Sequence, residues 1–63
     1  MGQYDEQIAN ATKRLTETEA EYTSASLSMA DAAPHVRDFV LSEIQRRIDE
    51  SKWMIQTFTE ANE

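Results

Sequence analysis

Residues 4–29, YDEQIANATKRLTETEAEYTSASLSM, carry apolar or small side chains at alternating steps of four and three residues. This spacing is the a/d pattern of a coiled-coil helix, and it continues for about four heptads. The seam consists of Tyr4, Ile8, Ala11, Leu15, Thr18, Tyr22, Ala25 and Met29. Because Ala11, Thr18 and Ala25 form a row of small side chains, a second helix can approach closely. The segment therefore predicts one long amphipathic helix over residues 4–29.

A second helix is predicted over residues 34–59, because neither proline nor glycine follows Pro34. Pro34 suits the first turn of a helix, where the amide hydrogen that it lacks has no helical partner. Asp31 is a residue type that caps helix N-termini, and we expect it to cap this helix. Glu43 and Arg47 have the i, i+4 spacing of a favourable ion pair. The predicted hairpin core consists of Ile8, Ala11, Leu15, Tyr22, Ala25, Met29, Val40, Ile44, Ile48, Ile55 and Phe58.

The two predicted helices are similar in length, and residues 30–33 leave room only for a short turn between them. At 1.5 Å per residue, about 26 residues give each helix a length of about 39 Å. We therefore predict an all-α fold, an antiparallel two-helix hairpin that forms one domain over residues 1–63. A chain this short buries only about 60% of its unfolded surface. Because it has no cysteine for a disulfide, we predict a homo-oligomer in which hairpins associate into a four-helix or larger bundle.

The only tryptophan, Trp53, lies off the core stripe of the second helix. At 100° per residue it stands about 180° from the centre of that stripe, and Phe39 stands about 220° from it. Phe39, Arg46 and Trp53 are seven residues apart and form a second seam, which Val36 and Met54 join to the core. Aromatic residues and arginine dominate interface hot spots, so these five residues are predicted to bind a protein partner. That partner is either a second copy or a different protein. The alternative is a flank tryptophan whose indole N–H stays in water.

The chain has a formal net charge of −6, from twelve acidic and six basic side chains. This charge opposes attraction to DNA, RNA or an anionic bilayer, so nucleic acid is disfavoured as a partner. No apolar run approaches the roughly 18 residues of a membrane span. Residues 1–10 lack the basic and apolar segments of a secretory signal. We therefore expect a cytoplasmic protein with no membrane partner.

The sequence contains no pattern that favours catalysis. His35, the only histidine, has Asp31 and Asp38 at i−4 and i+3, which is typical of electrostatics at a helix end. The Glu-x-x-His pattern of metal sites in helical bundles is absent. The only glycine, Gly2, excludes a glycine-rich phosphate loop. We expect no catalytic residues, no metal site and no cofactor, and a protein that is not an enzyme.

Residues 44–58, IQRRIDESKWMIQTF, resemble the second helix of type III secretion needle-chaperone partners, which are short acidic hairpins that shield an aggregation-prone protein. They also resemble the second helix of phage hairpin proteins that assemble as hexamers and sequester cyclic-nucleotide immune signals. Residues 36–47, VRDFVLSEIQRR, are similar to the second helix of small sporulation-checkpoint inhibitors of histidine kinases. All three resemblances imply a hairpin that acts by occupying a surface, as a chaperone or an inhibitor, and not by turning over a substrate.

Two further functions stay open at this point. Arg46, Arg47 and Lys52 cluster on the second helix, a pattern typical of a solvated charged face. In a symmetric oligomer, two such clusters would form a small anion-binding site for phosphate or carboxylate. The first alternative is therefore a phage-type oligomeric hairpin that sequesters a small phosphorylated ligand such as a cyclic nucleotide. The second is an RNA-binding dimer that forms a four-helix bundle.

Overall fold

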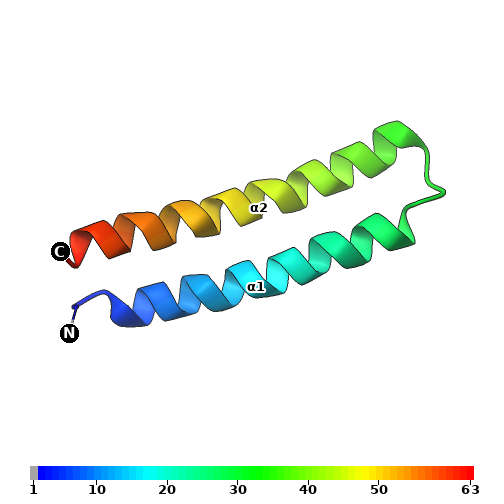
Figure 1. Ribbon diagram of the computed structural model, residues 1–63. Helices are drawn as coiled ribbons and strands as arrows, with labels where there is room; N and C mark the ends of the chain where they lie inside the picture. Colours follow the sequence, from blue (N-terminus) through cyan, green and yellow to red (C-terminus); the bar gives the residue numbers. More distant parts are fainter. Residues whose placement is uncertain (1) are drawn as a thin grey trace.

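The structure is a computed structural model that describes residues 2–63 as two helices, α1 (Asp5–Ser28) and α2 (Pro34–Ala61), joined by a short turn. The helices lie side by side and antiparallel, with both termini at one end of the hairpin and the turn at the other (Figure 1). The molecule measures 47 × 15 × 9 Å along its principal axes. Within these residues, neither helix is long and apolar enough to cross a membrane. The predicted all-α hairpin is confirmed, with helix ends that differ from the predicted ones by two residues or fewer.

Helix α1 stays regular although it is rich in serine and threonine. Asp5 and Glu6 occupy its first turn, where the positive end of the helix dipole favours carboxylates. The threonine hydroxyls turn back onto their own helix. Thr12 donates to the Ile8 carbonyl at 2.8 Å, and Thr18 donates to the Arg14 carbonyl at 2.7 Å. These hydroxyls therefore find acceptors within the helix without breaking it.

The turn between the helices corrects one prediction. The N-cap of α2 is Ala33, which makes no side-chain cap, so the prediction that Asp31 caps this helix is wrong. The reason is the position of Pro34, which is the first helical residue and therefore fixes the cap one residue earlier. Ala33 has the extended conformation expected before proline, with ψ at 136°. Its carbonyl accepts from the amides of Val36 and Arg37, each at 3.0 Å.

A polar clasp joins the open end of the hairpin. The Tyr4 amide donates to Asn62 Oδ1 at 3.0 Å, and Asn62 Nδ2 donates to Asp5 Oδ1 at the same distance. The rings of Tyr4 and Phe58 lie beside this clasp, with centroids 5.1 Å apart. Gly2 passes so close to Asn62 that a Cβ at this position would collide with the Asn62 side chain. One asparagine thus ties the beginning of α1 to the end of α2.

The core is a single seam between the two helices. Its fully buried side chains are Ala11 and Thr18 on α1 and Ile44, Ile48 and Ser51 on α2. The other members of the predicted core are half-buried, because two helices cover only one side of each other: Ile8, Leu15, Tyr22, Ala25, Met29, Val40, Ile55 and Phe58. Ser51 is the most enclosed side chain, at 1% exposure. Small side chains in the middle of the seam let the helices approach closely, but they contribute little apolar area.

An ion pair across the hairpin marks the register of the two helices. Arg47 Nη2 donates to Glu21 Oε1 at 3.0 Å, and Nη1 donates to Glu21 Oε2 at 3.4 Å. The predicted pair of Glu43 with Arg47 is wrong, because Glu43 pairs with Arg46 instead, at 3.2 Å. Arg47 stands only about 60° from Ile44 around α2, so its guanidinium reaches the facing edge of α1. A bidentate arginine–carboxylate pair has better geometry than the local alternative.

Candidate protein-binding surface

Two large aromatic side chains of α2 are exposed to solvent. Phe39 is 67% exposed and Trp53 is 65% exposed. Trp53 stands about 180° around the helix from Ile44, which is buried against α1. Phe39, Arg46 and Trp53 follow one another at intervals of seven residues, and we call these three residues the aromatic row. The aromatic row therefore runs along the side of α2 that faces away from α1.

Arg46 occupies the middle of the aromatic row, with a side chain that is 68% exposed. Its Nη2 donates to Glu43 Oε2 at 3.2 Å, one turn earlier on the same helix. This ion pair offsets the guanidinium charge locally and leaves the planar face of the guanidinium free to stack on an aromatic ring. The row thus presents two apolar rings separated by a locally neutralised arginine.

Val36 and Met54 lie on the flank between the aromatic row and α1. Both stand about 80° from Ile44, in the same direction around the helix. Val36 is 43% exposed, whereas Met54 is half-buried. Val36 therefore extends the accessible apolar surface, and Met54 adds only part of its side chain because the hairpin covers the rest.

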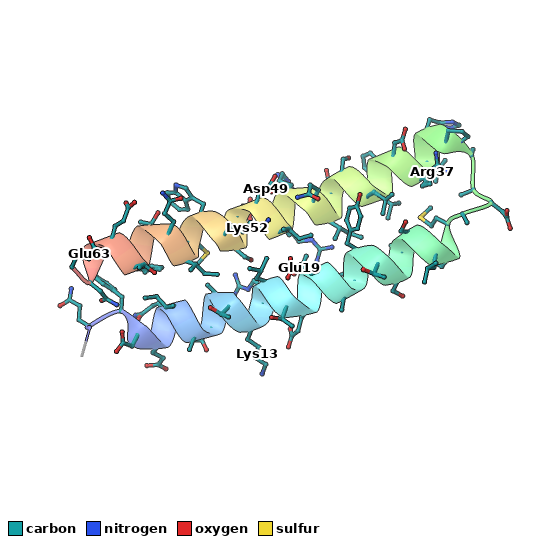
Figure 2. The ribbon with its side chains drawn as sticks, viewed as in Figure 1. Lys13, Glu19, Arg37, Asp49, Lys52 and Glu63 are labelled. Carbon is teal, nitrogen blue, oxygen red and sulfur yellow. The ribbon has the colours of Figure 1, made fainter. Side chains whose placement is uncertain are left out.

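A groove between the helices lies on the other flank of the seam, and we call it the Lys52 groove. It has a volume of about 470 Å³ and is lined by Leu15, Lys52, Ile55, Gln56, Thr59 and Glu60. A second, more polar hollow of about 270 Å³ continues it and is lined by Glu19, Tyr22, Thr23, Gln45, Ile48 and Lys52. Figure 2 shows Lys52 and Glu19 near the middle of the hairpin. The sequence pattern predicts Leu15 and Ile55 as core residues. It does not predict that a single hairpin leaves both of them half-buried at a groove.

The three candidate anion-binding residues do not come together within one hairpin. Arg46 lies in the aromatic row and pairs with Glu43. Arg47 pairs with Glu21 across the seam. Lys52 lies on the opposite flank, in the Lys52 groove. An anion site built from these residues stays a prediction that requires neighbouring subunits.

His35 lies at the turn end of the hairpin and is exposed, as are Asp31 and Asp38. Asp38 Oδ1 is 3.7 Å from Arg37 Nε, so that carboxylate already has a basic neighbour. Within residues 2–63, no three histidine, cysteine, aspartate or glutamate side chains are grouped so that they could hold a metal ion. The ion pair at this end of α2 therefore involves Arg37, and the predicted pairing of His35 with Asp31 or Asp38 stays a prediction.

Comparisons of the chain with protein-family models, with curated proteins and with solved structures find no match. The two surface features that distinguish this hairpin are the exposed aromatic row and the half-covered Lys52 groove, which lie on different sides of α2.

Proposed function

We propose that this chain is a non-enzymatic interaction protein, a helical hairpin that self-associates and binds another protein. The binding site is the aromatic row with the neighbouring Val36 and Met54. The observation that carries the proposal is the exposure of Phe39 and Trp53, each about two-thirds in solvent. Isolated exposed apolar residues are common, but aromatic residues around an arginine have the composition of an interface hot spot.

The accessible surface of the hairpin is larger than expected for its mass, which supports binding to a partner. Its accessible surface is 4728 Å². A compact monomer of 7.2 kDa has an accessible surface of about 4,100 Å² by the usual scaling with mass. The excess of about 600 Å² approaches the roughly 800 Å² that each partner contributes to a standard interface. The hairpin therefore exposes about one interface more than a chain of its size normally does.

Self-association fits the Lys52 groove better than the aromatic row. The groove contains half-buried Leu15 and Ile55, which a second hairpin would cover. Its lining carries both signs of charge, with Lys52 and Glu60 about two turns apart on α2. A two-fold copy can therefore place a lysine of one subunit near a carboxylate of the other. This arrangement makes a four-helix bundle and leaves the aromatic row free for a different protein.

The self-association is tested with one pair of arginine substitutions. Thr59 is exposed at the Lys52 groove, whereas Thr16 is exposed outside it on α1. We expect Thr59→Arg to lower the solution mass toward a single hairpin and Thr16→Arg to leave the mass of the unmodified chain. Sedimentation over a range of concentrations measures both. If the unmodified chain sediments as one hairpin at every concentration, the self-association is wrong.

The partner site is tested with one pair of alanine substitutions. Leu27 on α1 is 77% exposed and lies apart from the aromatic row, so it is a matched control for the loss of an exposed apolar side chain. Protein captured from the native host should be lost with Trp53→Ala and retained with Leu27→Ala. Equal capture by the two variants would show that the aromatic row does not bind the partner.

The ligand-sequestering and RNA-binding alternatives are separated from this proposal by simple measurements. A ligand at 100 times its Kd adds about 2.7 kcal/mol of stability, so a nucleotide panel would raise the melting temperature of a sequestering protein. We expect no such shift, because Arg46 and Arg47 already pair with glutamates. RNA binding would weaken steeply with salt. We expect no RNA binding to measure, because the basic residues of α2 lie on three sides of the helix.

A further inference from the structure

The charges of α2 are divided between its two halves. Counting from Ile44 at 100° per residue, Arg37, Arg47 and Lys52 lie within about 80° of the seam. The acidic residues of α2 all lie beyond about 90°, on the outer half: Asp38, Glu43, Asp49, Glu50 and Glu60. Each of these carboxylates is exposed. Figure 2 shows Asp49 on the edge of α2 that faces away from α1.

The outer half of α2 is therefore strongly acidic, although the helix as a whole is nearly balanced. Arg46 is the one arginine or lysine among the five carboxylates, so the outer half has a formal charge of −4 with His35 neutral. Arg46 lies between the two aromatic rings and is paired with Glu43. The carboxylates flank the aromatic row on both sides, with Glu43 and Glu50 along one edge and Asp49 and Glu60 along the other.

The spacing of the aromatic row sets the shape of its partner. Phe39 and Trp53 are separated by about 21 Å along the helix axis, at 1.5 Å per residue. A ligand that covers both rings is therefore elongated. A helix laid along α2 meets side chains at every seventh residue, as in a coiled coil, and places its own flanking residues against the edges of the row. Those edges carry carboxylates, so the matching flanks carry lysine or arginine.

Charge also decides against the competing occupants. A second copy would bring another surface of charge −4 against this one, and like charges across an interface are repulsive. Nucleic acid and an anionic bilayer are repelled for the same reason. A cationic partner gains attraction along the whole row while its apolar stripe covers the two rings. Resting on the function proposed above, we infer that the outer side of α2 docks a basic amphipathic helix of another protein.

The inference is tested with the full chain and three synthetic helical peptides. All three have leucine at the a and d positions and lack tryptophan, and they carry lysine, glutamine or glutamate at the e and g positions. Because Trp53 is the only tryptophan of the chain, its emission reports contact directly. We expect the lysine peptide to shift Trp53 emission to shorter wavelength and to bind more weakly as salt is raised. The glutamate peptide should not bind.

Matched charge variants separate local attraction from net charge. Glu43→Gln with Glu50→Gln removes two carboxylates at the aromatic row, whereas Glu6→Gln with Glu17→Gln removes two exposed carboxylates on α1. The first pair should lower the affinity for the lysine peptide by about fivefold, since exposed charge pairs contribute modestly. The second pair should change that affinity by no more than about twofold. Equal weakening by both pairs would overturn the inference, because it would reflect net charge alone.

The outcomes also distinguish this inference from the proposed function. If the glutamine peptide binds as tightly as the lysine peptide and both lose affinity in Trp53→Ala, followed with labelled peptide, the aromatic row is a binding site but its partner is not selected by charge. If the lysine peptide binds equally well to the unmodified chain and to Trp53→Ala, the aromatic row is not the site and both proposals are wrong. Absence of binding by the lysine peptide overturns the inference alone.

Discussion

Ile48→Ala should lower the stability of the hairpin more than Trp53→Ala does, whereas Trp53→Ala should weaken partner binding more than Ile48→Ala does. Ile48 is 5% exposed and lies in the seam between the two helices. Ile48→Ala therefore removes apolar side-chain atoms that are almost fully buried. Substitutions of this kind cost about 2–5 kcal/mol. A domain of this size has a stability of roughly 3–9 kcal/mol, at 0.05–0.15 kcal/mol per residue. At the middle of both ranges, Ile48→Ala therefore removes about half of the stability.

The corresponding figure for Trp53 follows from its exposure. Because the side chain is 65% exposed, the hairpin covers about a third of it. A third of a tryptophan surface of about 250 Å² is about 85 Å², which at 25 cal/mol per Å² gives at most ~2 kcal/mol. Residual burial in the unfolded chain lowers this by roughly 10–40%, so we expect about 1.5 kcal/mol. The exposed two-thirds would contribute about 2–4 kcal/mol when a partner covers them.

Urea unfolding followed by circular dichroism measures both free energies. All variants must be compared at one protein concentration, because the proposed self-association would make the apparent stability depend on it. The placement of Ile48 in the seam and of Trp53 outside it is refuted if Ile48→Ala lowers the free energy of unfolding by less than Trp53→Ala does. That order would mean that the side of α2 carrying Trp53 packs inside the folded unit and that Ile48 faces outward.

Three further predictions concern contacts that fix the hairpin. A double-mutant cycle with Glu21→Gln and Arg47→Gln should give a coupling of about 0.5 kcal/mol, since both side chains are half-exposed, and thermal melts would measure it. Asn62→Ala should cost about 1 kcal/mol and speed hydrogen exchange at the open end of the hairpin, because it removes both side-chain bonds of the clasp. Ala33→Asp should stabilise α2 by about 1 kcal/mol at neutral pH, because the present N-cap makes no side-chain bond; an unchanged melting temperature would contradict this.

Local periodicity accounts for what was predicted about the fold. The a/d spacing of residues 4–29 and the uninterrupted chain after Pro34 give both helices, and their similar lengths give the hairpin. The exposure of Phe39 and Trp53 also agrees with their helical positions, since residues half a turn from a buried stripe face solvent when only one neighbour is present. Whether a partner covers these rings is a separate question, which the aromatic-row experiments address.

Contacts that depend on register were not predictable in the same way. The partner of Arg47 is Glu21, which is 26 positions away in sequence, and the local i, i+4 rule selected Glu43 instead. The clasp of Asn62 with Tyr4 and Asp5 likewise joins opposite ends of the chain. Such pairs follow only once the antiparallel alignment is known. The prediction that Asp31 caps α2 failed for a different reason. Pro34 fixes the first residue of the helix, so the N-cap is Ala33 although aspartate is the better capping residue type.

The distribution of side-chain sizes in the hairpin links its weak core to its exposed surface. The fully buried positions include Ala11, Thr18 and Ser51, which bring the helices together but bury little apolar area. The largest apolar side chain, Trp53, lies outside the seam. Tyr22 and Phe58 are half-buried at the seam, whereas a sequence that specified only a stable lone hairpin would also place Phe39 and Trp53 there, where each would contribute most to folding. The position of Phe39 and Trp53 on the acidic side of α2 is consistent with a chain whose exposed apolar area serves recognition.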